Sequence, residues 1–240
     1  MKANSHIIRL FTFSILFTVF SISLYAQSVS GSGNVVEQNR NLSGFTAIKV
    51  SSGVDLHIIQ GTADKVIVKA DDNLQGHIKT ELNGNTLEVS AKGNIRRANA
   101  FDVYVTVKTL TEISVSAGSD VYSEGTLSFN QLNLIASSGS DVELSLDGEK
   151  LYCKISAGSD ARLDGKVDYL EVTASGGSDL KAKGLSAGSC KLRVSGGSDA
   201  YVHVKGDLDM EASGASDIFY TGSPSITHSK ASGSSDIHGN

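Results

Sequence analysis

Apolar and polar residues alternate in short stretches through the second half of the chain, and the pattern recurs about every 19 residues. Each recurrence contains the five-residue unit Ser-x-x-Ser-Asp. The aspartates that close this unit are Asp120, Asp141, Asp160, Asp179, Asp199, Asp217 and Asp236. Successive aspartates are 21, 19, 19, 20, 18 and 19 residues apart. A nearly fixed period of this size predicts a repeat protein, in which each unit buries its apolar face by stacking on its neighbours.

The apolar positions keep the same place in every repeat when the repeats are aligned on their aspartates. Three mainly apolar rows precede the aspartate by five, seven and nine residues, and a fourth follows it by one residue. In the repeat that closes at Asp179 these positions hold Ala174, Val172, Leu170 and Leu180. Because alternate residues of a strand face the same side, the rows are predicted to point into one interior.

Coils of this length can pair their backbone groups only with the coils above and below them. We therefore predict an all-β fold, a parallel β-helix of about seven coils over residues 110–240, preceded by a β-rich region with a hairpin. Parallel crossovers are overwhelmingly right-handed, so a right-handed helix is expected. Thr227 and Ser229 replace apolar residues in the last repeat, which predicts a polar end to the stack.

Residues 44–109 are predicted to form the N-terminal β region. Residues 51–55 match the repeated unit except that Val54 replaces the second serine, so they are interpreted as a degenerate first coil. The sequence Asn-Gly-Asn at 83–85 lies between two alternating stretches and predicts a β-hairpin. The rest of the interval before Asp120 does not repeat, so this region is expected to depart from a regular solenoid.

The first 26 residues have the layout of a secretory signal peptide. Lys2 and Arg9 flank the start of an apolar run from Leu10 to Leu24, and Ala26 is a small residue at the expected cleavage position. The alternative is an uncleaved membrane anchor. Residues 27–43 are polar and are expected to form a flexible leading segment. The mature protein is thus expected to be extracytoplasmic, in the periplasm, on the cell surface or secreted, without a transmembrane segment.

The net charge of the chain argues against a nucleic acid partner, and the positions of its two cysteines argue against a disulfide. The chain has a formal net charge of −5, and removal of the signal peptide takes away two basic residues. A nucleic acid partner is therefore excluded, because a phosphate-binding surface needs a basic excess. Cys153 and Cys190 fall two coils apart, about 10 Å along the axis. A disulfide needs Cα atoms within about 7 Å, so both are predicted to be buried free thiols.

Three stretches resemble a known family. They are Phe45–Gly61, Asn85–Val89 and Leu110–Asp120, together with the repeats that follow. In these stretches the chain is similar to the secreted bacterial head GIN domain family, whose members are described as auto-transporter adhesin heads. The resemblance implies a β-helical protein of the cell surface or periplasm, and it supplies no catalytic residues.

The row of aspartates carries an electrostatic cost. Coils stack about 4.8 Å apart, so neighbouring carboxylates would repel by roughly 1 to 3 kcal/mol. One interpretation is that each carboxylate accepts backbone N–H bonds from its own Ser/Gly corner. The other is that the seven aspartates and corner carbonyls bind calcium, and no other cofactor is expected. The calcium-binding β-roll signature has a nine-residue period and is not matched.

A second candidate surface lies two residues beyond each aspartate, where side chains are expected to point outward. These residues are Tyr122, Glu143, Arg162, Lys181, Tyr201, Phe219 and His238. Aromatic rings and bidentate polar groups on a flat sheet suit a glycan or a cell-surface protein. The alternative is a solvated sheet face whose aromatic residues favour the strand conformation.

No arrangement of residues predicts catalysis. The histidines lack the spacing of metal ligands, and the sequence contains no nucleophile elbow. The predicted function is that of a secreted, non-enzymatic β-helical binding module, adhesive toward a glycan or a cell-envelope partner. Two alternatives stay open, a polysaccharide-active β-helix enzyme and a structural spacer without a ligand. Arg162 and Lys181 form too small a basic cluster to favour the enzyme.

Overall fold

The computed structural model describes residues 28–240, and the predicted signal peptide lies outside this range. The described part of the chain consists mostly of strands, with one short 3₁₀ helix, η1 (Asp72–Leu74). The N-terminal strands are β1 (Ser28–Ser30), β2 (Val35–Arg40), β3 (Ala47–Ser51), β4 (Asp55–Gln60), β5 (Lys65–Asp71), β6 (Ile78–Asn83), β7 (Thr86–Ala91), β8 (Asn94–Arg97) and β9 (Phe101–Val107). Among these residues we find no helix with the length and apolar character needed to cross a membrane.

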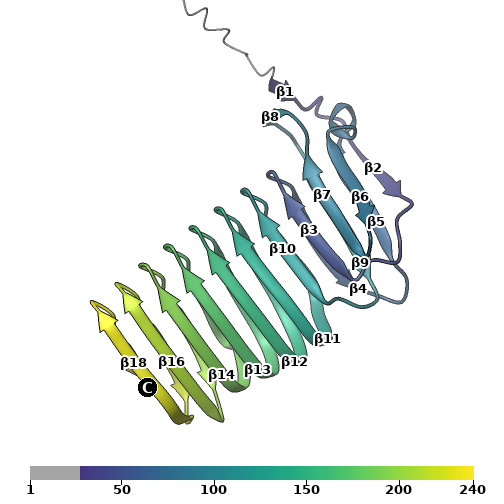
Figure 1. Ribbon diagram of the computed structural model, residues 1–240. Helices are drawn as coiled ribbons and strands as arrows, with labels where there is room; N and C mark the ends of the chain where they lie inside the picture. Colours follow the sequence, from purple (N-terminus) through teal and green to yellow (C-terminus); the bar gives the residue numbers. More distant parts are fainter. Residues whose placement is uncertain (1–27) are drawn as a thin grey trace, which may run out of the picture.

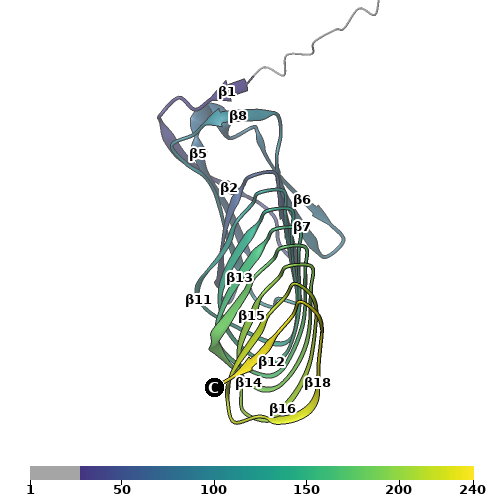
Figure 2. The same ribbon diagram turned by 90° about the vertical axis from the view of Figure 1, so that its left-hand side faces the viewer.

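The second half forms the predicted parallel β-helix (Figure 1). Its strands are β10 (Glu112–Ser116), β11 (Val121–Ser137), β12 (Asp141–Ser156), β13 (Asp160–Ser175), β14 (Leu180–Ser195), β15 (Ala200–Val204), β16 (Asp207–Gly214), β17 (Ile218–Gly222), β18 (Ser225–Gly233) and β19 (Ile237–Gly239). The register keeps the repeats aligned, since Ser137 pairs with Ser116 below it and Ser156 above it. Viewed nearly along the stack, the coils superpose as flattened loops (Figure 2).

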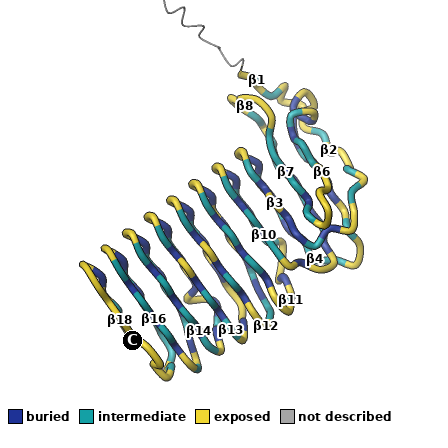
Figure 3. The backbone as a smooth tube through the Cα atoms, viewed as in Figure 1, coloured by how far each residue is buried: buried dark blue, intermediate teal, exposed yellow. Residues whose placement is uncertain are grey.

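The apolar rows face inward, as the alternation predicts. Leu170, Val172 and Ala174 of β13 are at most 1% exposed, and they belong to one continuous hydrophobic core. The last coil differs, because every residue of β18 is exposed (Figure 3). Thr227 and Ser229 are thus polar and exposed, whereas Leu208 and Met210, the apolar residues at these positions in the preceding repeat, are buried.

Strands β3 and β4 form the predicted degenerate first coil. They pair in parallel with β10 and β11 above, so the unit at 51–55 lies directly under the unit at 116–120. On the other side, β7 pairs with β3 and β9 pairs with β4, which adds a further coil that the sequence did not reveal. The predicted hairpin is present as the antiparallel pair β6 and β7. The interval before Asp120 is thus an excursion that folds back under the first coil.

The structure corrects the expectation of a flexible leading segment at 27–43. Strand β1 pairs with β8, and β2 pairs antiparallel with β5 over the whole range Val35–Arg40. The side chains of β2 are exposed or half-buried and lack a buried face, so no alternation marks it as a strand. Its order comes from backbone pairing with the edge of β5, which is invisible in the sequence.

Both cysteines are buried free thiols, as predicted. Cys153 lies on β12 and Cys190 on β14, so one whole coil separates them. Burial raises the pKa of Cys153 to about 12 and also raises the pKa of Cys190. Since the thiolate is the reactive form, both side chains act as small apolar residues of the core.

Candidate functional site

The Ser-x-x-Ser-Asp unit makes the corner between two sides of each coil. Its second residue adopts left-handed backbone in all seven units, and its third residue does so in the five units up to Asp199, with φ of 55° at Ala117 and 68° at Gly118. Side chains crowd the backbone in this region, which explains why Gly, Ala or Ser occupies the second position and why Gly occupies the third in those five units. The turn places Ser119 in the interior and leaves Asp120 on the surface.

The second serine of each unit is buried and supplies a hydrogen-bond acceptor to the coil below. The N–H of Ser159 donates to Ser178 Oγ at 3.2 Å, and the N–H of Ser178 donates to Ser198 Oγ at 2.9 Å. The same bond joins four further pairs of coils, in which the hydroxyls of Ser119, Ser159, Ser216 and Ser235 accept. Ser140 differs, because its hydroxyl donates to the main-chain oxygen of Ser137. These hydroxyls satisfy corner N–H groups that would otherwise be buried without a partner.

Val54 departs from the repeated unit for a physical reason. The coil below it consists of β7 and β9, which are joined through β8 and not through a Ser-x-x-Ser-Asp corner. The base of the ladder therefore needs no hydroxyl at this position. The N–H of Val54 still donates upward, to Ser119 Oγ at 3.1 Å.

The aspartates lie on the outer side of the corner and accept hydrogen bonds from the coil above. Asp179 Oδ1 accepts from the N–H of Asp199, and Asp199 Oδ1 accepts from the N–H of Asp217, both at 3.1 Å. Asp120, Asp160 and Asp217 accept the same bond from their next coils. The interpretation that each carboxylate accepts N–H bonds from its own corner is therefore wrong. The N–H donors belong to the next coil, and the N–H groups of each corner bond to neighbouring coils. The next-coil N–H offsets part of the repulsion between carboxylates.

Replacing Ser178 by alanine should lower the free energy of unfolding by about 1 to 3 kcal/mol. The substitution removes the acceptor of the Ser159 N–H, which then stays buried without a partner. Ser175→Ala is the matched control, because Ser175 opens the same unit but is not buried. Urea unfolding followed by circular dichroism measures the difference. Equal midpoints for the two variants would show that the buried hydroxyl is dispensable.

The residues two positions beyond the aspartates form a single row across the coils, which we call the outward row. In stacking order it contains Tyr104, His57, Tyr122, Glu143, Arg162, Lys181, Tyr201, Phe219 and His238. Sequence reasoning missed its first two members. His57 follows the degenerate unit by two residues, a signal that was available. Tyr104 follows no repeat unit, and only the pairing of β4 with β9 places it in the row.

Aromatic rings stack on one another at both ends of the outward row. The ring centroids of Tyr201 and Phe219 are 4.6 Å apart, and those of Phe219 and His238 are 4.8 Å apart. At the other end, His57 stacks on Tyr104 at 4.5 Å. Such rings cover one another, so the free ring faces are those that end each stack.

The N-terminal end of the outward row is surrounded by carboxylates. His57 Nδ1 is 2.9 Å from Glu124 Oε1, and His57 Nε2 is 3.7 Å from Asp102 Oδ1. Burial raises the pKa of Asp55, and the charges of Asp120 and Asp102 raise it further. This part of the surface is therefore strongly negative.

The middle of the outward row is hollowed between Tyr122 and Lys181, with a volume of about 220 Å³. His57 covers one face of Tyr122 at a centroid distance of 5.4 Å, so the opposite face borders the hollow. Lys181 Nζ is 3.1 Å from Asp160 Oδ2, whereas Arg162 makes no ion pair within the described chain. A larger groove of about 860 Å³ is lined by Gln60, by the segment before β10 and by parts of β11, β12 and β13. It contains none of the predicted site residues.

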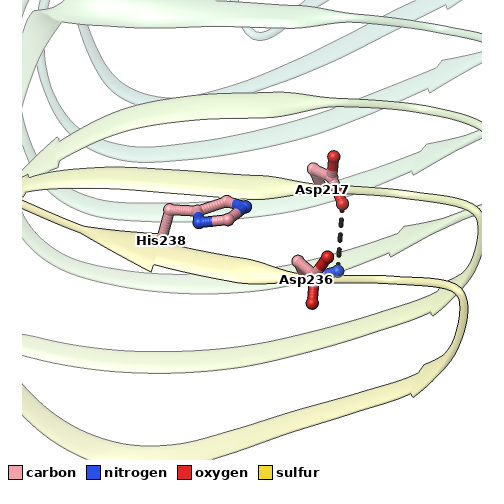
Figure 4. A group of neighbouring side chains, drawn as sticks. All are labelled: Asp217, Asp236 and His238. Carbon is pink, nitrogen blue, oxygen red and sulfur yellow. Dashed lines mark hydrogen bonds between the residues drawn. The ribbon is translucent and has the colours of Figure 1, made fainter.

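The C-terminal end of the stack brings together Asp217, Asp236 and His238, each with one ligand atom within 4.8 Å of the others (Figure 4). The carboxylate of Asp217 also accepts the N–H of Asp236 at 2.9 Å. Calcium prefers six to eight oxygen ligands, so two carboxylates and an imidazole are a poor set for it. All seven predicted aspartates lie in one row along the stack. Among the described residues, the C-terminal end of this row is the place where a histidine, His238, lies within 4.8 Å of two of the aspartates.

Solved structures share this architecture. A putative adhesin from Bacteroides fragilis NCTC 9343 is 22% identical with a TM-score of 0.82, covering 89% of this chain and 100% of that chain. A putative adhesin from Parabacteroides merdae ATCC 43184 is 18% identical with a TM-score of 0.69, and the match covers 90% of this chain and 100% of that chain. A putative lipid binding protein from Parabacteroides distasonis ATCC 8503 is 20% identical with a TM-score of 0.70, and the match covers 89% of this chain and 100% of that chain. These identities show a common fold alone. No curated protein matches the chain.

A family model described as "Putative auto-transporter adhesin, head GIN domain" matches residues 44–224. The match includes the degenerate first coil, the excursion that folds beneath it and all but the last repeat. It covers well over half of the chain and confirms the resemblance that the repeated unit indicates. The chain belongs to the head GIN domain family.

Proposed function

We propose that this protein is a non-enzymatic, extracytoplasmic binding module that holds a glycan in the hollow of the outward row. One observation carries the proposal: a free aromatic face and an unpaired guanidinium border the same hollow. Tyr122 supplies the face, and Arg162 supplies the guanidinium. Small-molecule sites typically combine apolar or aromatic walls with a few polar groups that fix orientation.

The chemistry of the hollow suits a sugar ring. The apolar face of a pyranose can pack on the open side of Tyr122, while its hydroxyl groups meet charged hydrogen-bonding groups. Glu143 accepts hydrogen bonds, and the planar guanidinium of Arg162 donates several in a fixed geometry. Acidic and basic side chains are both present around the hollow, which favours a neutral ligand over a strongly charged one.

The repetition of coils favours an extended polymer over a single sugar. Neighbouring coils present an outward-row residue about every 4.8 Å along the stack, so a chain lying along the axis meets a new side chain at each coil. Several weak contacts to one polymer add through effective concentration, without any single deep pocket. Adhesion to a polysaccharide or another glycan of a cell envelope needs this kind of binding.

The family description and the adhesin names of two neighbours agree with a binding role at a cell surface. The Parabacteroides distasonis neighbour is named as lipid binding, which makes an acyl chain a rival ligand. The charged lining of the hollow disfavours an acyl chain. The enzyme alternative would need an acid–base pair at the hollow, for which Asp141, Glu143 and Asp160 are the candidate carboxylates. Release of reducing ends from a bound polysaccharide distinguishes that role from binding alone.

A glycan array probed with the purified mature protein tests the proposal. We expect binding to at least one neutral glycan, and Tyr122→Ala and Arg162→Gln should each weaken it about tenfold or more. Tyr152→Ala is the matched control, because Tyr152 pairs with Tyr169 at 6.1 Å outside the outward row. Absence of any glycan binding, or equal losses in the control, would refute the proposal. A chelator arm tests calcium, since loss of binding in chelator would assign the aspartate row to cation binding.

A further inference from the structure

A second hollow, of about 420 Å³, lies at the opposite end of the stack from β18. The end of β2, the turn after η1 and the start of β6 line it, and Lys92 closes one side. Its cationic members are Arg40, Lys79 and Lys92, and no carboxylate is among its lining residues. This composition is unusual in a chain with a formal net charge of −5.

The guanidinium of Arg40 is held in place but incompletely paired. Its Nη2 donates to the main-chain oxygen of Gln75 at 2.9 Å. Its Nε is buried and has no hydrogen-bond partner among the described residues. The buried Nε is out of reach of the hollow, so the Nη groups are the part of the guanidinium that a ligand could contact.

The scaffold around Arg40 is fixed before any ligand arrives. The Gln75 side chain, only 9% exposed, donates to the main-chain oxygens of Val36 at 2.8 Å and Val68 at 3.1 Å. Gln75 therefore ties the turn after η1 to β2 and β5, and its carbonyl positions the guanidinium. A preorganised donor loses little entropy when a ligand binds.

Charge completes the case for a ligand. No carboxylate lies within ion-pair distance of Arg40 in the described chain, although the rest of the surface is rich in them. Lys79 is paired with Glu81, and Lys92 has no such partner among the described residues. A partly buried cation without a counter-ion is costly, and an anion entering this hollow would offset that cost.

We infer that this hollow is a binding site for a phosphate group. Arg40 presents a planar fork that matches two phosphate oxygens, and Lys92 adds an unpaired point charge at the rim. Lys79 adds a second charge, which it shares with Glu81. The hollow is larger than a bare phosphate, so it has room for the group that carries the phosphate. That carrier is a soluble phosphate ester or a lipid head group. The site lies apart from the outward row and does not depend on the proposed glycan function.

Calorimetry with inorganic phosphate on the mature protein, at constant ionic strength, tests the site. We expect saturable binding with one phosphate per chain, and Arg40→Met should weaken it about tenfold or more. Arg40→Met also removes the contact with Gln75, which contributes to folding, so the double variant Lys79→Gln/Lys92→Gln provides a second test at the rim of the hollow. Lys49→Gln/Lys65→Gln is the matched control, with the same charge change on exposed residues of β3 and β5.

Two probes distinguish the carriers. Glycerol 3-phosphate tests the soluble ester, and phosphatidylcholine vesicles with or without phosphatidic acid test the lipid. Binding of either probe that falls in the Lys79/Lys92 variant, but not in the control, supports the site and names its carrier. Failure of inorganic phosphate and both probes to bind would overturn the inference. Equal losses in the control variant would also overturn it, because they would indicate only nonspecific attraction.

Discussion

Replacing Gly165 by alanine is expected to destabilise the β-helix by about 3 kcal/mol or more. Gly165 has a φ of 113°, a backbone conformation that is strained for any residue with a side chain. A Cβ at this position would lie only 2.0 Å from the main-chain oxygen of Leu146 in the coil below. The backbone of one coil would have to move away from the next, and their pairing would weaken.

Gly158→Ala is the control for this expectation. Gly158 also has a positive φ, of 71°, but a Cβ there would meet nothing within 4 Å. The preceding Ala157 already adopts φ of 56° in the same corner. The control should therefore cost only about 1 to 2 kcal/mol. Urea unfolding of both variants gives the comparison, and equal losses would show that contact between coils does not determine the cost.

The repeated half of the fold was predictable because its period is visible in single residues. The Ser-x-x-Ser-Asp unit that ends at Asp160 forms a corner of the coil, with left-handed backbone at Ala157 and Gly158. The inward rows followed from alternation, since Leu170 and Val172 are both buried. Stacking then fixes the neighbours of every coil, so a local pattern is enough to specify a global arrangement.

The N-terminal half was less predictable because its strands pair through an excursion of the chain that has no repeat, in which β7 and β9 fold back against β3 and β4. Tyr104 and Asp102 enter the two surface rows only through the pairing of β9 with β4, although no repeat unit precedes them. Strand β2 is likewise ordered by pairing with β5 and not by an alternating face. The positions of Tyr104 and Asp102 and the order of β2 depend on pairing between segments that are distant in the sequence. A local pattern of apolar and polar residues carries no information about such pairing.

The same distinction applies to the two candidate sites. Seven of the nine members of the outward row were named from the sequence, because they share a fixed offset from a repeated aspartate. Arg40 lies in a leading segment that resembles a flexible linker, and its importance appears only when Gln75 is folded against it. The hydrogen-bond partners of the aspartates were also hidden, because each donor belongs to the next coil, as with Asp199 and Asp179. Sequence periodicity thus predicts which residues share a row along the stack, but it does not predict which groups of other coils form hydrogen bonds with them.

Asp71 holds the N-terminal end of the molecule together. Its side chain is fully buried and accepts hydrogen bonds from the N–H groups of Gly33, Asn99 and Ala100. These donors come from the loop before β2 and from the loop between β8 and β9. Burial by itself raises the pKa of Asp71, but the N–H bonds from Asn99, Gly33 and Ala100 outweigh it and hold the pKa below its ordinary value.

A carboxylate with a lowered pKa stabilises the fold at a defined pH. The contribution of Asp71 is complete above the carboxyl pKa of the unfolded chain, about 3.9, and is lost as the pH falls through the lower folded value. We expect the amides of Gly33 and Asn99 to lose protection below this range, where protection is the ratio of the intrinsic to the observed exchange rate at the same pH. At neutral pH they should stay protected.

Asp71→Asn should therefore remove this protection even at neutral pH. The amide nitrogen of the new side chain would face an N–H donor, so at least one buried donor would lose its acceptor. We expect a thermal midpoint lower by about 5 °C or more. Glu37→Gln, which removes the same charge from the exposed face of β2, should leave both measurements unchanged. If Asp71→Asn kept the exchange rates and the midpoint of the unsubstituted protein, the carboxylate would have no role in joining the two loops.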